Sequence, residues 1–186
     1  MPIGIQFPSI LLAAQAGAGW AVDVLFREYH PPLLRYLRAR SGAEAEDLAG
    51  EVWLALTPQL ARFSGDEDGF RGLLFTIAHR RLVGHQRQTA RRRTDPVGDD
   101  LLDARPAADD PAESGVAAVA TQQAVDRLVA CLPADQAEVV LLRVVAGLPA
   151  DEVGRITKRS AGAVRVLQHR ALRRLAREFS DLAVTP

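Results

Sequence analysis

Apolar residues recur along this 186-residue chain at intervals of three and four, the spacing that places side chains on one face of an α-helix. Alternating apolar and polar runs bounded by turns, the signature of strands, do not stand out. Three helical stripes fall in the first half, the first around an interruption at Pro31-Pro32 and the second stopping near Pro58. They are Leu25, Tyr29, Leu33, Leu34 and Leu37; Leu48, Val52, Ala55 and Leu56; and Phe70, Leu73, Leu74, Ile77, Ala78 and Leu82.

The second half of the chain repeats this helical pattern after a gap. Residues 94–115 carry three prolines and many Asp and Ala residues, a composition that buries too little apolar surface to order itself. Helical periodicity resumes at 116–132, and a second helix over about 134–146 ends at Gly147. The pattern predicts an all-α fold: two small helical domains, 8–93 and 116–182, joined by an acidic flexible linker, 94–115.

Composition narrows the class of protein. With 48% hydrophobic and 25% charged residues, the chain is typical of a globular protein. Its single cysteine, Cys131, excludes an internal disulfide framework and a cysteine-based zinc site, and it favours a reducing cytoplasm. The apolar segment "SILLAAQAGAGWAV" has no basic residue before it and is interpreted as a first helix. No run of eighteen apolar residues exists, so we expect no membrane insertion.

The formal net charge of zero hides a strong pattern. Residues 71–93 hold seven arginines and no acid, residues 94–115 hold seven acids and one arginine, and residues 155–177 hold eight basic residues and no acid. Two acid-free basic blocks on helices are the electrostatic footprint of a protein that binds a polyanion. The alternative is a pair of solvated helix faces, and the repetition of the block favours nucleic acid.

The segment "GLPADEVGRITKRSAGAVRVLQHRALRRLAR" has the spacing of a helix-turn-helix. Pro149 suits the first turn of a short helix, "TKRS" forms the turn, and Ser160 caps the next helix. Small Gly154 allows the two helices to approach closely. The buried positions are Val153 and Ile156 on the first helix and Val164, Leu167, Ala171 and Leu175 on the second.

The second helix of this unit can present its outward side to the major groove of DNA. That side carries Arg165, Gln168 and His169, and Lys158 and Arg159 precede it. An ordinary helical hairpin with a basic solvated face is the alternative.

Three segments, in order, resemble extracytoplasmic-function sigma factors of bacterial RNA polymerase over about residues 10–178. They are "EAEDLAGEVWLAL", "FRGLLFTIAHRRLVGHQRQTARRR" and "LPADQAEVVLLRVVAGLPADEVGRITKRSAGAVRVLQHRALRRL". The resemblance implies that the first domain, sigma region two, binds the β′ clamp helices of core RNA polymerase and opens the −10 element of promoter DNA. It implies that the second, region four, binds the β flap and reads the −35 element, and that the linker passes near the RNA exit path.

The resemblance also implies roles for residues. Core polymerase would bind Asp47, Glu51 and Leu54, which share a face different from that of the buried stripe of their helix. The −10 DNA would bind His79, Arg80, Arg87, Arg91, Arg92 and Arg93, and the loop 62–70 would help to form a pocket for a flipped base. The −35 DNA would bind Lys158, Arg159, Ser160, Arg165, Gln168 and His169. An anti-sigma factor is a further partner that the family leads us to expect.

The chain departs from the family pattern at several of these positions. It has Leu73 where the family often has Trp, Arg80 for Asn, Gly84 for Asp, and Leu167 for Arg, and Gly50 replaces a glutamine. Because Leu167 completes the buried stripe, base reading is expected to shift to neighbours such as Arg165 and Gln168. Neither a cofactor nor a metal nor a catalytic residue is expected.

Two other functions are alternatives to this interpretation. One is a free-standing helix-turn-helix regulator, which would leave the first domain without a role. The other is a nuclease using His79, His85 and nearby carboxylates. The spacing of six between these histidines does not suit shared ligation of a metal.

Overall fold

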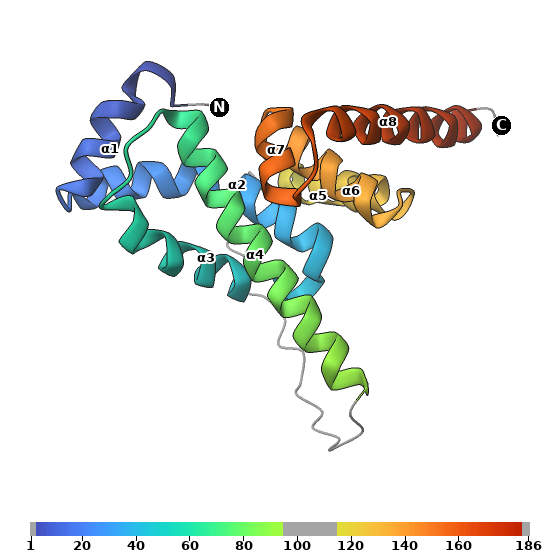
Figure 1. The fold of residues 1–186 in the computed structure, drawn as a ribbon, viewed down its shortest axis with the longest axis horizontal. Helices are drawn as coiled ribbons and strands as arrows, with labels where there is room; N and C mark the ends of the chain where they lie inside the picture. Colours follow the sequence, from blue (N-terminus) through green and yellow to red (C-terminus); the bar gives the residue numbers. More distant parts are fainter. Residues whose placement is uncertain (1–2, 95–114, 184–186) are drawn as a thin grey trace.

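The computed structural model describes residues 3–94 and 115–183, with side chains described over 3–91 and 119–178. Every regular element in these ranges is helical, as the periodicity predicts (Figure 1). The proposed linker, 94–115, lies almost entirely outside the described residues. In chain order the elements are η1 Gly4–Gln6, α1 Phe7–Gln15, α2 Gly19–Ser41, η2 Gly42–Glu44, α3 Ala45–Leu60, α4 Glu67–Thr94, α5 Gly115–Ala130, α6 Ala134–Val140, η3 Leu141–Val145 (a π-helical turn), α7 Ala150–Thr157 and α8 Ala161–Ala183.

Helix α2 differs from its predicted form because Pro31 and Pro32 lie inside it without interrupting it. Each proline removes one backbone hydrogen bond, which weakens a helix locally. The helix nevertheless continues, because its apolar stripe is buried on both sides of the prolines, from Leu25 to Leu37. Helix α3 likewise includes Pro58 and ends two residues beyond it.

Helices α1 to α4 enclose the core of the first domain, which contains aromatic rings and most residues of the three predicted stripes; Leu34, Ala55 and Leu73 are only partly buried and pack against it. Phe70 lies at its centre and contacts the rings of Phe7, Tyr29 and Phe63. Glu67, at the start of α4, accepts hydrogen bonds from the backbone amides of residues 3 and 4 and from the Tyr29 hydroxyl. These bonds fix the N-terminal segment against the start of α4.

Helices α5 to α8 form the second helical unit, and it packs directly against the first. Helix α2 contacts α5 and η3, and α4 contacts α7. One cluster of buried apolar side chains extends through both units, from Phe75 of α4 to Val139 of α6 and Val153 of α7. Helix α8 instead projects away from the first unit, so most of its length is free of that contact (Figure 1).

Candidate nucleic-acid and polymerase interfaces

Helices α7 and α8 form the predicted helix-turn-helix, and its turn is closely constrained. Pro149 is the N-cap of α7, and Lys158 ends that helix in a left-handed conformation with φ of 57°. The Ser160 hydroxyl accepts a hydrogen bond from the backbone N–H of Ala163 at 3.1 Å, so the predicted cap is present. At Gly154, an added Cβ would lie 2.5 Å from the carbonyl oxygen of Arg159. The close approach predicted at Gly154 is therefore between helix α7 and the residues of the turn.

The apolar positions predicted for α7 and α8 are all buried. On the opposite side of α8, Arg165 and His169 are exposed, as are the three residues 158–160 that precede the helix. Gln168, in contrast, is half-buried, and its side-chain oxygen accepts a hydrogen bond from Arg143 Nε at 3.0 Å. Of the three residues of α8 predicted to contact DNA, Arg165 and His169 are therefore more accessible than Gln168.

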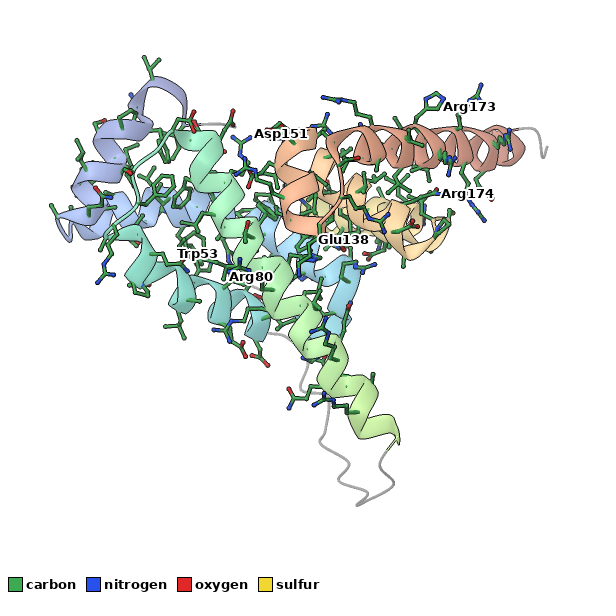
Figure 2. All side chains as sticks on the ribbon, viewed as in Figure 1. Trp53, Arg80, Glu138, Asp151, Arg173 and Arg174 are labelled. Atoms are coloured by element: carbon green, nitrogen blue, oxygen red, sulfur yellow. The ribbon has the colours of Figure 1, made fainter. Side chains whose placement is uncertain are left out.

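Helix α3 separates its apolar stripe from the residues expected to meet polymerase. Asp47 and Glu51 are exposed, and Leu54 is 76% exposed although it is a large apolar residue. Glu51 forms an ion pair with Arg81 of α4 at 3.3 Å. Trp53, labelled in Figure 2, turns away from this face and donates a hydrogen bond to His30 Nδ1 at 3.2 Å.

Helix α4 carries the first basic block. Arg80, Arg87 and Arg91 are exposed, whereas the side chains of Arg92 and Arg93 lie outside the described residues. Arg80 and Arg87 line a hollow of about 450 Å³ whose other wall is α7, with Arg155 and Lys158. The two basic blocks of the sequence therefore face each other across this hollow.

The loop 62–70, predicted to help form a base pocket, is held in a turn at the start of α4. Asp66 accepts a hydrogen bond from the backbone N–H of Gly69 at 2.8 Å, and the Phe63 ring packs edge-on against Phe70. Ser64 and Asp68 are exposed. The loop thus presents polar groups at the end of the molecule where α4 begins.

His79 does not extend freely toward solvent, because Glu138 of α6 reaches it from the second unit. His79 Nδ1 lies 2.9 Å from the Glu138 carboxylate, and the Tyr36 hydroxyl donates to the same carboxylate at 2.7 Å. Arg40 Nε lies 3.2 Å from its other oxygen, an ion-pair distance without the alignment of a hydrogen bond. Glu138 is 7% exposed, the one fully buried charged residue among the described side chains.

The surroundings of Glu138 favour its charged form. Burial alone would raise the pKa of Glu138, but the hydrogen bonds from His79 and Tyr36 and the charge of Arg40 outweigh burial, so this pKa is lowered. Burial, together with the negative carboxylate, raises the pKa of the Tyr36 hydroxyl well above its ordinary value. At neutral pH Glu138 is therefore a carboxylate anion held among the Tyr36 hydroxyl, the His79 ring and the Arg40 guanidinium.

The sequence contains a weak signal for this cluster. Glu138 interrupts an otherwise apolar run, Ala137 to Leu142, whose residues are all buried. A carboxylate in such a position needs partners that its own helix does not supply. The partners could not be named from sequence, because they lie 59 to 102 residues away.

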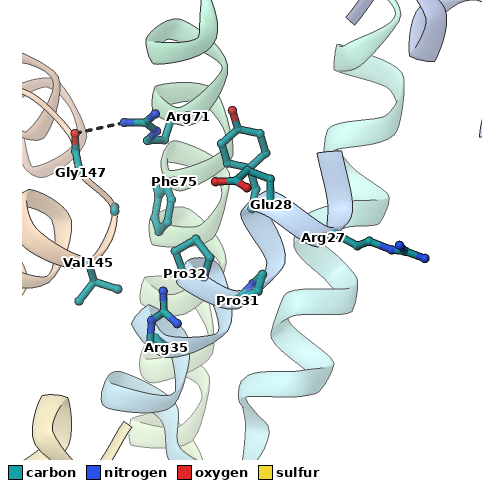
Figure 3. A pocket seen from close by; sticks show the side chains of 11 residues that line it. Arg27, Glu28, Pro31, Pro32, Arg35, Arg71, Phe75, Val145 and Gly147 are labelled. Carbon is teal, nitrogen blue, oxygen red and sulfur yellow. Dashed lines mark hydrogen bonds between the residues drawn. The ribbon is translucent and has the colours of Figure 1, made fainter. Parts of the chain in front are cut away.

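A second hollow, of about 360 Å³, lies between the units where α2 and α4 meet residues 145–147 (Figure 3). Arg71 of α4 points across it, and its Nη1 donates to the carbonyl oxygen of Gly147 at 3.5 Å. Arg35 and Phe75 line the same hollow. The junction of the two units therefore includes both polar and apolar side chains.

Two searches of the described residues bear on other classes of function. No cluster of three or more His, Cys, Asp or Glu residues there could hold a metal ion. His79 and His85 pair with different carboxylates, since His85 lies 2.7 Å from Glu44. None of the described helices is both long and apolar enough to span a membrane.

Comparison with known proteins identifies the class to which this arrangement belongs. The family description "Sigma-70 region 2" matches residues 25–92, and "Sigma-70, region 4" matches residues 122–175. These are the α2–α4 unit and the unit that contains the helix-turn-helix.

Relatives that match most of this chain narrow the class of protein further. It is 34% identical over 182 residues to the ECF RNA polymerase sigma factor SigD of Mycobacterium tuberculosis, covering 95% of this chain and 85% of that protein. It is 36% identical over 172 residues to the ECF RNA polymerase sigma factor ShbA of Streptomyces griseus, covering 87% and 89%. The chain belongs to the extracytoplasmic-function (ECF) family of RNA polymerase sigma factors.

A solved structure supports the fold. CnrH, determined in complex with the cytosolic domain of CnrY, matches with a TM-score of 0.62 and 18% identity, over 94% of this chain and 97% of CnrH.

Proposed function

We propose that this ECF sigma factor binds core RNA polymerase through α3 and promoter DNA through α4 and the α7–α8 unit. One observation carries the proposal most strongly: a capped helix-turn-helix presents exposed Arg165 and His169 on the outward side of α8. Arginine and histidine side chains donate hydrogen bonds to guanine and other base edges in the major groove. Gln168 joins them when Arg143 releases its side-chain oxygen.

The polymerase contact is assigned to Asp47, Glu51 and Leu54. An exposed leucine beside two carboxylates combines an apolar anchor with charges that steer a basic partner into register. The β′ clamp helices are the partner that the family leads us to propose. Glu51 forms an ion pair with Arg81 at the surface. Such a solvent-exposed pair is weak, so a basic residue of polymerase would replace Arg81 at little cost in free energy.

The −10 contact is assigned to the basic face of α4. Exposed arginines such as Arg80, Arg87 and Arg91 neutralise phosphates, which supplies affinity and position without reading sequence. Arg92 and Arg93 are proposed to extend this face. The loop 62–70, at the other end of the helix, is proposed to receive a base that leaves the stack.

The protein is proposed to act in the cytoplasm, where polymerase acts, without catalytic chemistry of its own. A free-standing helix-turn-helix regulator is not favoured, because the match includes region 2 as well as region 4. An anti-sigma factor is proposed as a further partner of this chain, as the family leads us to expect.

Transcription with purified core polymerase tests the function. Core polymerase with this protein should start transcripts at discrete positions, and sequencing the transcript ends identifies them. Leu54→Asp should abolish binding to core, whereas Leu12→Asp, at a residue of α1 that is 67% exposed, should leave binding intact.

A second pair of variants distinguishes recognition of DNA bases from a general effect of positive charge on DNA binding. Arg165→Ala should keep core binding and lose selective starts, whereas Arg173→Ala, which removes the same charge further along α8, should retain them. Failure of the unmodified protein to bind core polymerase would refute the proposed function.

A further inference from the structure

The loop 62–70, proposed to receive a flipped base, is held by the N-terminal segment of the chain. In Figure 1 the N-terminal turn and α1 lie beside the connection between α3 and α4. At the start of this connection, the Gln15 side-chain amide of α1 donates hydrogen bonds to the carbonyl oxygens of Leu60 and Phe63, at 2.9 and 2.8 Å. One side chain of α1 thus fixes the backbone where the chain leaves α3.

At the other end of the loop, the Glu67 carboxylate is bound by two successive backbone amides. The N–H groups of Ile3 and Gly4 donate to its two oxygens at 2.9 and 2.7 Å. Ile3 is right-handed and Gly4 left-handed, with φ of −63° and 66°, an alternation that directs successive N–H groups toward one anion. Burial raises the pKa of Glu67, but the hydrogen bonds from Tyr29 and from these amides lower it overall, so Glu67 is charged at neutral pH.

The middle of the loop rests on aromatic rings that lead back to α1. The Phe63 ring lies so close to Gly65 that a Cβ added there would be 2.9 Å from the ring. Phe63 packs edge-on against Phe70, and Phe70 contacts Phe7 of α1 with ring centroids 5.6 Å apart. Residues 3–15 therefore support the loop at its start, at its middle and at its end.

This support is important because the loop has little regular structure of its own. Residues 63–66 belong to no helix, and the bond from Gly69 to Asp66 lies within the first turn of α4. A site whose residues are already ordered binds its ligand without paying for their loss of conformational freedom. The contacts from residues 3–15 therefore make the loop ready to receive a base.

We infer that residues 3–15, the N-terminal brace, position the loop 62–70 for the base that leaves the stack of the −10 DNA. The inference rests on the proposed function, because it deepens the role of the same loop. The brace precedes residues 25–92, the part of the chain that matches Sigma-70 region 2. Gln15 and Gly4 are its positioning residues: they act through the loop and not on the DNA.

Two substitutions release the two ends of the loop without changing its sequence. Gln15→Leu keeps most of the size of the side chain and removes both donors to the loop. Gly4→Ala adds a methyl group that meets none of the described atoms within 4 Å, so it acts through the positive φ that alanine disfavours.

Each substitution has a matched control in the same domain. Gln59→Ala removes a glutamine near the loop whose amide donates to Ala55 of its own helix. Gly19→Ala adds a methyl group at an exposed glycine that has open space around it and no positive φ. Circular dichroism verifies the helical content of all four variants.

The binding assay uses the holoenzyme formed by core polymerase and the full-length protein. The probe is a fluorescent single strand that carries the −10 element of a promoter mapped from transcript ends. Abasic sites, introduced one at a time, identify the base whose removal weakens binding by the unmodified protein most. The ratio of affinities for the intact strand and for that abasic strand measures the contribution of the base, since both strands carry the same phosphates.

Both brace variants should lower this ratio about ten-fold, because freeing one loop residue costs roughly the free energy of a ten-fold change in affinity. Affinity for the abasic strand, which depends on the arginines of α4, should stay unchanged, and the controls should keep the ratio. An unchanged ratio in a folded brace variant, or an equal loss of affinity for both strands, would overturn the positioning role. If one brace variant proves unfolded, the other carries the test.

Hydrogen exchange in the free protein tests the brace without polymerase. The amides of Arg62 and Phe63, which donate to the carbonyl oxygens of Gln59 and Leu60 at 3.1 Å, should exchange about ten-fold faster in the brace variants than in the controls. Equal exchange would overturn the brace.

These outcomes distinguish the brace from the proposed function. Faster exchange in the variants of a protein whose holoenzyme discriminates no base would mean that the proposed role of the loop has failed, and the positioning role with it. Base discrimination that the brace variants retain in full would leave the proposed function intact and reject the brace alone.

Discussion

Replacing Gly154 by alanine tests whether the turn of the helix-turn-helix is as tight as its geometry indicates. The substitution adds one methyl group to a buried position of α7, directly under the turn. The new Cβ would lie 2.5 Å from the carbonyl oxygen of Arg159, well inside contact distance. Arg159 also donates its backbone N–H to the Gly154 carbonyl at 2.8 Å. A shift of the turn away from Gly154 would therefore break this hydrogen bond.

The expected magnitude follows from three opposing terms. Alanine is favoured over glycine in a helix interior by about 0.8–1.0 kcal/mol. Overpacking a well-packed site costs about 1–3 kcal/mol, and a backbone hydrogen bond contributes about 1 kcal/mol. Gly154→Ala should therefore destabilise the protein by about 1–3 kcal/mol. For a chain of this length that lowers Tm by roughly 2–4 °C per kcal/mol.

Gly50 supplies the matched control, because it lies exposed in α3 and an added Cβ would meet nothing within 4 Å. Gly50→Ala should raise Tm by about 2–4 °C, since only the helix-propensity gain remains. Thermal unfolding followed by circular dichroism measures both variants. A rise in Tm for Gly154→Ala comparable to that of Gly50→Ala would refute the close approach of turn and helix.

Two further predictions concern single side chains. Ser160→Ala should cost about 1 kcal/mol in urea unfolding, because the backbone N–H of Ala163 loses its cap; Ser160→Asp should retain most of the stability, and equal losses in both variants would exclude capping as the cause. Glu138 has a lowered pKa, so its stabilising contribution is complete above the ordinary carboxyl pKa of 4.5 and is lost as pH falls through its folded-state value. The Tm difference between the unmodified protein and Glu138→Gln should therefore be large at pH 7 and shrink below about pH 4.5, and a difference independent of pH would contradict a charged Glu138.

Sequence periodicity was sufficient for the helices and for the helix-turn-helix because both follow from local rules. Val164, Leu167, Ala171 and Leu175 are buried as one stripe, and Ser160 caps the helix that carries them. The expected interruption at Pro31-Pro32 was wrong for a non-local reason. Packing of the stripe on both sides of the prolines outweighs the hydrogen bonds that they remove.

The junction between the two units could not be predicted from the sequence. Periodicity identifies which face of a helix is buried but not what covers it, and the partners of Glu138 come from two other helices far away in the chain. His79 illustrates the consequence. Its place on the basic face of α4 was evident from spacing, whereas its hydrogen bond to Glu138 required the fold.

The charge pattern of the chain has a second explanation once the fold is known. The basic blocks 71–93 and 155–177, which indicate DNA binding, also face each other across the junction of the units. One acid of the second unit reaches the first block, since Glu138 pairs with His79 as well as with Arg40 of α2, and Glu152 pairs with Arg155 within α7. Both Glu138 and Glu152 precede the acid-free stretch 155–177 in the chain. A net charge of zero is therefore no evidence against nucleic-acid binding, because seven acids are concentrated in residues 94–115 and the two basic blocks hold no acid of their own.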